Sequence, residues 1–267
     1  MLGKKIRLER IFNRNTKKTI IVPMDHGAGM GPIPGLLDFG KTVNKVANGG
    51  ANAVVGHIGL PIWGHRNYGQ DIGLILHLSV STILNPVDGN DKVLVNTVER
   101  AIKMGADGVS IHVNVGSRNE SAQLKDLGEI AGRCLEWGMP LLAMMYPRGE
   151  GIEKGQDQDV KYVKVAARIG AELGADIIKT YYPGSAETMA EVVEGCPAPI
   201  VIAGGAKGSD REALDMIEGA AKGGAAGLSM GRNVFQREDA DKFIKAAGEI
   251  VHNNKTAEEA LEILEGK

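Results

Sequence analysis

The stretch Gly174-Ala175-Asp176-Ile177-Ile178-Lys179-Thr180 indicates how the chain folds. A glycine that closes a helix is followed by small or polar residues and then by a short apolar run, as in loops that lead from a helix into a buried strand. Similar phrases recur at Gly50-Ala51-Asn52-Ala53, Gly105-Ala106-Asp107-Gly108 and Gly224-Ala225-Ala226. The repetition predicts a chain in which helices and strands alternate.

Eight short apolar runs have the length of strands. Several are continuous rather than alternating in polarity, as expected for strands that are buried on both faces. The eight runs are Thr19–Met24, Ala53–Gly56, Ile72–Leu78, Gly108–Val113, Pro140–Met145, Asp176–Thr180, Pro199–Ala203 and Ala226–Met230. Eight strands that alternate with helices over this length predict a (β/α)8 TIM barrel, an α/β fold. A doubly wound open sheet is the alternative, because it uses the same alternation.

Apolar residues with helical spacing separate most of these runs. The expected helices cover Asp91–Met104, Ala122–Trp137, Tyr162–Leu173, Ala186–Val193, Asp210–Ala221 and Ala240–Val251. Residues 3–14 predict an extra N-terminal helix that closes the N-terminal face of the barrel or forms a subunit contact. Thr256 and Glu259 predict a capping box for a C-terminal helix that stops at Gly266. No linker or charge block divides the sequence, so a single domain over residues 1–267 is expected.

The composition excludes several classes of partner. The 31 basic and 33 acidic residues are interspersed, the net charge is −2, and aromatic residues make up only 4% of the chain. A nucleic-acid partner is therefore not expected, because such surfaces need basic stripes and stacking rings. The sequence contains no run of 18 apolar residues and no signal-peptide core, which predicts a cytoplasmic protein with no membrane partner. Cys134 and Cys196 lack the spacing of a disulfide framework or a metal site.

Lys179 is the residue with the clearest chemical implication. It lies in an apolar run, where an ammonium group loses its hydration and its pKa should fall. A lysine that is neutral near pH 7 attacks carbonyl carbons and forms a Schiff base. The alternative is a structural lysine whose aliphatic stem lies on the core while its ammonium group reaches solvent.

The carboxyl ends of the strands carry the other candidate residues, because that face holds the active site of a TIM barrel. Tyr146 and Asp25 suit an imine-forming lysine: the phenol can carry protons, and the carboxylate can stabilise the cationic imine. Taken alone, each also has a structural explanation, since Asp25 could cap a turn and Tyr146 could be a half-buried phenol. The candidate substrate contacts at the same face are His26, Gly29, Pro147, Arg148, Thr180 and Tyr181.

A phosphate site is predicted after the last two strands. Gly204, Gly205 and Gly231 allow backbone N–H groups to approach an anion, and Arg232 adds a guanidinium fork for phosphate oxygens. TIM barrels often bind phosphate at this position, although plain loop glycines are the alternative. The glycines of Gly27–Gly35 lack dinucleotide-loop spacing, and Pro32 stands where the helix of that motif should begin. This segment is predicted to be a mobile loop over the substrate.

A metal-dependent aldolase is the rival chemistry. His26, His57 and His112 could converge at strand ends, as in a zinc site. No His-x-His or i,i+4 pair supports this arrangement, and it leaves Lys179 without a role. The sequence therefore predicts no metal and no separate cofactor.

Five motifs, spread over nearly the whole chain, combine in a way that is specific to one family. They are Pro23-Met24-Asp25-His26-Gly27, Met145-Tyr146-Pro147-Arg148-Gly149, Ile178-Lys179-Thr180, Ala203-Gly204-Gly205 and Gly231-Arg232-Asn233-Val234-Phe235-Gln236. Together they resemble the archaeal-type class I aldolase family. The resemblance implies a TIM barrel in which Lys179 forms the imine, Tyr146 donates protons and Asp25 is the third catalytic residue. It also implies that Gly204, Gly205, Gly231 and Arg232 hold the substrate phosphate.

The family contains fructose-bisphosphate aldolases, a thiolase, and synthases that join two substrates in a transaldol reaction. The synthases transfer a three-carbon fragment of 6-deoxy-5-ketofructose 1-phosphate to L-aspartate semialdehyde, in a route to 3-dehydroquinate and aromatic amino acids. The loops Val113-Asn114-Val115-Gly116, Gly64-His65-Arg66-Asn67-Tyr68-Gly69 and His77-Leu78-Ser79 are most similar to those of the synthases.

Two single positions bear on this choice. Met144 replaces a tryptophan that is common in the fructose-bisphosphate aldolases. Gly29 departs from the synthases, which have a hydroxyl residue in this loop. The resemblance further implies a homo-oligomer, such as a decamer or another cyclic assembly.

Overall fold

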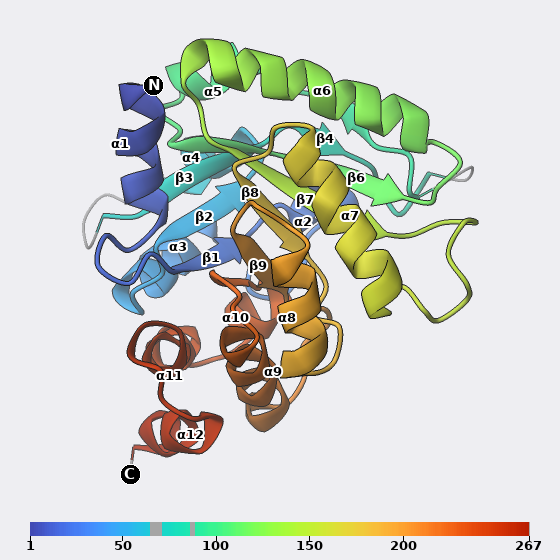
Figure 1. The fold of residues 1–267 in the computed structure, drawn as a ribbon. Coiled ribbons are helices and arrows are strands. Elements are labelled where there is room, and N and C mark those ends of the chain that lie inside the picture. Colours follow the sequence, from blue (N-terminus) through green and yellow to red (C-terminus); the bar gives the residue numbers. More distant parts are fainter. Residues whose placement is uncertain (65–70, 86–88, 267) are drawn as a thin grey trace.

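The computed structural model describes residues 1–64, 71–85 and 89–266. Eight parallel strands close into a barrel in the order β1-β10-β9-β8-β7-β6-β3-β2 (Figure 1). The strands are β1 Thr19–Pro23, β2 Ala53–Gly56, β3 Gly73–His77, β6 Gly108–Val115, β7 Leu141–Pro147, β8 Ile177–Thr180, β9 Ile200–Ala203 and β10 Gly227–Ser229. The predicted TIM barrel is confirmed. The open sheet is wrong, because β1 and β10 pair with Thr19 opposite Gly227 and so close the ring.

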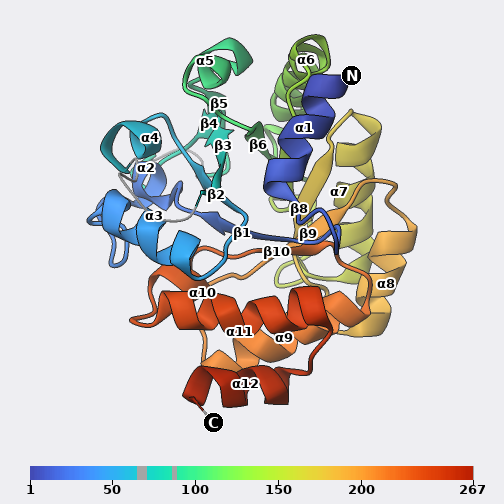
Figure 2. The same ribbon diagram turned by 90° about the vertical axis from the view of Figure 1, so that its left-hand side faces the viewer.

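Helices surround the barrel and bury the outward faces of the strands. They are α3 Phe39–Asn48, α4 Gly59–Gly64, α5 Val98–Lys103, α6 Glu120–Trp137, α7 Val160–Glu172, α8 Ala186–Glu194, α9 Asp210–Lys222, α10 Arg232–Phe235, α11 Ala240–Asn253 and α12 Ala257–Glu265. Figure 2 shows α12 outside α11 and α9, so the chain ends in a second layer. The predicted capping box of α12 is confirmed, because Thr256 and Glu259 each bond the other's backbone N–H. Among the described helices, none combines the length and apolar character that a membrane crossing requires.

The first helix, α1 Leu2–Ile11, covers the amino-terminal end of the barrel (Figure 1). Ile11 is buried there, and its carbonyl accepts a hydrogen bond from Thr19 Oγ1 at 2.6 Å. Lys4 pairs with Asp176 at 2.9 Å, immediately before β8. The helix therefore closes the barrel end opposite the carboxyl ends of the strands, as one of the two sequence-based alternatives proposed.

The expected helix over Asp91–Met104 is wrong in its first half. Residues Val93–Leu94 form β5, which pairs antiparallel with β4 Ser79–Val80 in a small hairpin. Helix α5 begins only after Thr97, whose side chain accepts the Arg100 N–H. The physical reason is that Thr97 caps the helix, while the β-branched Val93 and Val95 before it favour extended backbone.

The segment expected to be a loop over Gly27–Gly35 contains a short helix, α2 His26–Met30. It ends at Gly31, whose φ of 78° is a left-handed conformation that favours glycine. The long loop after β2 contains α4 in its described part. Residues 65–70, which include most of the motif that begins at Gly64, lie outside the described residues.

Candidate active site

The carboxyl ends of the strands surround a cavity with a volume of about 330 Å³. Of the described residues that line it, four are basic (Lys92, Arg148, Lys179 and Arg232) and one, Asp25, is acidic. The rest of the chain compensates this charge, since the protein as a whole has a net charge of −2. A concave site with this charge asymmetry attracts anionic ligands.

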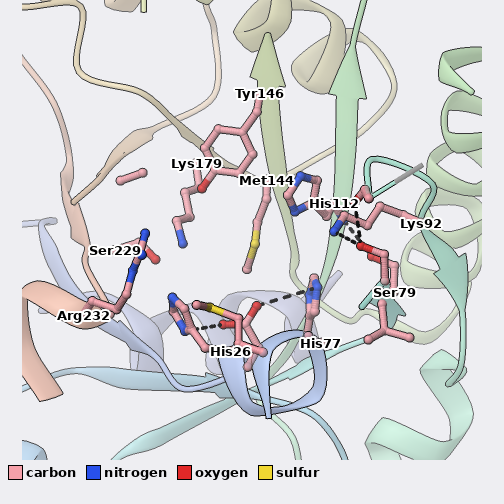
Figure 3. Close-up of a pocket in the computed structure, with 18 of the residues that line it drawn as sticks. His26, His77, Ser79, Lys92, His112, Met144, Tyr146, Lys179, Ser229 and Arg232 are labelled. Carbon is pink, nitrogen blue, oxygen red and sulfur yellow. Dashed lines mark hydrogen bonds and ion pairs between the residues drawn. The ribbon is translucent and has the colours of Figure 1, made fainter. Parts of the chain in front are cut away.

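Lys179 lies on β8, next to Met144 of β7 in the strand register, and both side chains enter the cavity (Figure 3). Only 7% of Lys179 is exposed. Burial lowers the pKa of its amine to about 8; the charge of Asp25 opposes this shift and that of Arg148 adds to it. A substantial fraction of the amine is therefore neutral at physiological pH, as a carbonyl nucleophile requires.

Asp25 follows β1 and faces a group of imidazole rings. Its carboxylate oxygens lie 3.6 Å from His26 Nδ1 and 3.9 Å from His77 Nε2. Burial favours the neutral acid, but His77, His26, Lys179 and His57 together hold the pKa of Asp25 well below its usual range. Asp25 is thus a partly buried anion at neutral pH, facing the amine of Lys179.

His77 is fixed behind this carboxylate. It is 3% exposed, and its Nδ1 lies 2.7 Å from Ser110 Oγ. Burial lowers the pKa of His77 to about 3, so the ring is neutral at pH 7 and Lys179 supplies the positive charge that faces Asp25. Neutral imidazole rings therefore flank Asp25, and Lys179 remains the cation that balances the charge of the carboxylate.

Tyr146 belongs to a cluster of polar rings, tilted against one another, beside Lys179. Its ring centroid lies 5.0 Å from that of His112 and 4.7 Å from that of Tyr181. The guanidinium of Arg148 lies 4.8 Å from the Tyr146 ring centroid and donates to Tyr181 Oη at 2.6 Å. Burial raises the pKa of Tyr146 above its usual range, which outweighs the opposing charge of Arg148. The phenol is therefore protonated at neutral pH and available as a proton donor.

Gly204 after β9 and Gly231 after β10 have no room for a Cβ atom. A Cβ on Gly231 would lie 2.5 Å from His26 Cε1, and one on Gly204 would lie 2.7 Å from Met230 Cγ. Asn233 fastens the two loops to each other, because its Nδ2 donates to Gly204 O at 2.6 Å and to Ala206 O at 2.8 Å. We call Gly204, Gly205, Ser229, Gly231 and Arg232 the glycine cradle.

Two buried polar atoms of the cradle have no hydrogen-bond partner among the described residues. They are Ser229 Oγ and Arg232 Nε. Buried polar atoms are normally paired, so an unpaired hydroxyl and an unpaired guanidinium nitrogen at a cavity wall indicate a ligand with acceptor atoms. A phosphate supplies such acceptors, and Arg232 matches its charge.

Most of the predicted site residues line this one cavity. They are Asp25, His26, Gly29, Tyr146, Arg148, Lys179, Tyr181, Gly204, Gly205, Gly231 and Arg232. Pro147 and Thr180 do not. Side chains alternate along a strand, so each faces the opposite way from its neighbour, Tyr146 or Lys179. Thr180 is fully buried, and a substrate contact of Pro147 or Thr180 stays a prediction.

The sequence alone assigned no role to Lys92, His77, Ser229 or Asn233. Ser229 could not be recognised because it lies in an apolar run typical of a buried strand. Asn233 could not be recognised because it contacts backbone atoms of another loop, which the sequence does not reveal. The metal alternative gains no support from the geometry: within the described ranges, no three His, Cys, Asp or Glu side chains gather closely enough to hold an ion.

Comparison with known proteins gives consistent results. A model of the DeoC/LacD family of aldolases matches residues 19–237. The chain is 45% identical to 2-amino-3,7-dideoxy-D-threo-hept-6-ulosonate synthase 1 of Archaeoglobus fulgidus, over 98% of this chain and 96% of that protein. It is 39% identical to 2-amino-4,5-dihydroxy-6-oxo-7-(phosphonooxy)heptanoate synthase of Streptomyces griseus, over 95% and 92%.

A solved structure is also similar. It is an archaeal fructose-1,6-bisphosphate aldolase with the catalytic Lys covalently bound to the carbinolamine intermediate of the substrate. The TM-score is 0.82 and the identity is 30%, over 93% of this chain and 99% of that one.

Proposed function

Because the chain belongs to the DeoC/LacD aldolase family, we propose that it is a Schiff-base aldolase in which Lys179 attacks the ketone of a phosphorylated sugar. The observation that carries this proposal is a lysine amine inside a barrel mouth, with a lowered pKa and a partly buried carboxylate beside it. Attack gives a carbinolamine and, after loss of water, an iminium ion, so no separate cofactor is needed. The iminium withdraws electrons and allows the neighbouring C–C bond to break or form.

We assign the remaining steps to two residues of the same cavity. Tyr146, protonated at neutral pH, donates a proton to the departing oxygen and takes one from the hydroxyl group of the bond that breaks. Asp25 stabilises the cationic iminium, because it remains ionised next to Lys179. The glycine cradle is proposed to bind a phosphate on the carbon next to the attacked ketone, through its backbone N–H groups and Arg232.

The activity that we propose is that of 2-amino-3,7-dideoxy-D-threo-hept-6-ulosonate synthase, a transaldolase-type transferase. A three-carbon fragment of 6-deoxy-5-ketofructose 1-phosphate remains on Lys179 and is then joined to L-aspartate semialdehyde, which leads towards 3-dehydroquinate and aromatic amino acids. The 45% identity over nearly the full length of both proteins supports this choice. The test is to incubate the purified protein with both substrates and to identify the seven-carbon product by mass.

A class I fructose-bisphosphate aldolase, a lyase, is the second candidate. The 30% identical aldolase with the same fold and a lysine-bound intermediate favours it. Rapid cleavage of fructose 1,6-bisphosphate alone, with no product from L-aspartate semialdehyde, would select this candidate. A non-enzymatic phosphosugar-binding barrel would form no borohydride-reduced adduct on Lys179 with either substrate.

The rate of imine formation should depend on pH through Lys179. Only the neutral amine attacks, and a pKa of about 8 makes it roughly 300-fold more abundant at pH 7 than an ordinary lysine amine. The rate of borohydride trapping with dihydroxyacetone phosphate should rise about tenfold per pH unit up to pH ~7.5 and level off above pH ~8. A rise that continues to pH 10 would show that the amine is not perturbed.

Arg232→Met tests the phosphate assignment. Hydrogen bonds to charged groups contribute roughly 1.5–3 kcal/mol, so the dihydroxyacetone phosphate concentration for half-maximal trapping should rise at least about tenfold. Dihydroxyacetone lacks the phosphate and serves as the matched control, for which the half-maximal concentration should stay the same. An equal rise for both ketones would mean that Arg232 shapes the cavity without binding phosphate.

A further inference from the structure

The cavity contains a cation that the proposed chemistry does not use. Lys92 lines it from the hairpin of β4 and β5, and its amine donates to Ser81 Oγ. The backbone next to it is anchored, because Asn90 O accepts Asn114 Nδ2 at 2.9 Å and Gln123 Nε2 at 2.7 Å. The ammonium group is therefore held at the cavity wall by fixed elements of the barrel.

Lys92 and the glycine cradle lie on opposite sides of Lys179. Figure 3 shows Ser229 and Arg232 on one side of the amine, and His112, Ser79 and Lys92 on the other, with Tyr146 between Lys179 and His112. The Ser79 hydroxyl accepts the backbone N–H of His112 at 3.0 Å, which joins the hairpin to β6. The charge of Lys92 reaches this strand, because after burial it is the largest cause that lowers the pKa of His112.

The names of the two synthase relatives describe the product that must fit this cavity. Both products carry an amino group at C2 of a seven-carbon acid, a ketone at C6 and hydroxyl groups at C4 and C5. A ketone held as an imine at C6 forms its new bond from C5, so C4 was the aldehyde carbon of the acceptor. The acceptor is therefore a four-carbon amino-acid aldehyde whose carboxylate lies three carbons from the reacting carbon.

Resting on the proposed function, we infer that Lys92 binds the carboxylate of this acceptor aldehyde. Protons move at the bond that C5 forms, so C5 must lie near the proton donor Tyr146, which is on the Lys92 side of Lys179. C7, the other carbon attached to the imine carbon, then points to the glycine cradle. The acceptor consequently extends from Tyr146 towards the hairpin, where Lys92 offers a point charge for an anion.

The aldehyde that leaves in the first half of the reaction bonds to the same carbon and occupies the same space. A 7-deoxy product requires that the donor sugar forms its imine with Lys179 through the ketone next to its methyl group. The phosphate is at the other end of the donor, so it departs with the leaving aldehyde. Lys92 would then bind the phosphate of the leaving aldehyde in the first half of the reaction and the carboxylate of the acceptor in the second half. The glycine cradle would bind a phosphate when C7 bears one, as the name of the Streptomyces griseus relative describes.

The test is binding of L-homoserine, the unreactive alcohol form of L-aspartate semialdehyde, measured by ligand-observed NMR or calorimetry on the full chain. Lys92→Met should raise its Kd about tenfold or more, and Lys92→Arg should restore most of the affinity. L-Homoserine amide, which lacks the carboxylate charge, should bind weakly and equally to all variants. Lys245→Met, at an exposed position on α11, is the matched control and should behave as the wild type.

Three results would overturn the inference: no binding of L-homoserine by the wild type, equal Kd values for wild type and Lys92→Met, or equal affinity for the acid and the amide. Binding does not depend on turnover, so these results are distinct from failure of the proposed function. That failure would be an absence of borohydride-trapped ketone on Lys179 in the wild type. Thermal melts of each variant separate loss of the anion contact from a displaced hairpin.

Discussion

Lys179→Ala is expected to abolish the activity, with a fall in kcat/KM of roughly 10⁵-fold or more, because it removes the amine that forms the iminium. Each later step passes through the covalent intermediate, and the binding that remains cannot replace it. Steady-state assays with the keto-sugar phosphate and the acceptor aldehyde measure the loss. Mass spectrometry after borohydride treatment should find no adduct at all.

Lys179→Met is the matched variant for this experiment, because its unbranched side chain is only one atom shorter and fills most of the same space. Both variants should melt cooperatively near the wild-type temperature, since the amine contributes chemistry more than packing. Loss of a cooperative melt in both would mean that Lys179 is a structural partner of Asp25. An adduct that persists in either variant would place the imine on a different lysine.

The fold could be predicted because its signals are local. The phrase at Gly174-Ala175-Asp176 and its repeats mark the turns from helix to strand, and the β-rich runs that follow fix eight strands. The errors have a different origin. The β4–β5 hairpin is stabilised by contacts between residues far apart in sequence, such as the bond from Val95 N to Leu78 O at 2.8 Å. Helical spacing of apolar residues around Val93 could not reveal that contact.

The candidate site shows the same division. Lys179, Tyr146 and Asp25 could be identified because each stands at a strand end with an unusual chemical character for its surroundings. Lys92 could not, because a lysine in an expected surface helix gives no signal, and only the hairpin turns it towards the cavity. Pro147 and Thr180 stay predicted substrate contacts, although neither lines the cavity, because side chains alternate along a strand.

The three central groups have different protonation states at pH 7, and this separation suits acid–base chemistry. Burial acts on all of them, but Asp25 remains ionised among polar neighbours, while Tyr146 remains a phenol. Lys179 lies between these limits and changes its charge near the working pH. Such divergent environments are the usual way in which one cavity supplies an anion, a nucleophile and a proton donor.

Tyr146→Phe should therefore leave the nucleophile in place and remove only the proton carrier. General acid–base catalysis contributes roughly 10²–10⁴-fold, so kcat should fall by about 10³-fold. The ring and its contacts with His112 and Tyr181 are retained, so the cavity should keep its shape and its affinity for the ketone. Rapid-quench measurement of product formation, with saturating donor and acceptor, gives the size of the loss.

Prolonged incubation with dihydroxyacetone phosphate and borohydride distinguishes this variant from Lys179→Ala. Tyr146→Phe should still accumulate an adduct, although slowly, because Lys179 remains nucleophilic without the phenol. Tyr162→Phe, a tyrosine at the surface whose hydroxyl bonds Glu153, controls for the substitution itself and should keep full activity. Turnover of Tyr146→Phe within about threefold of the wild type would assign proton transfer to another group. The neutral imidazole of His112, which packs against the same ring, would be the next to test.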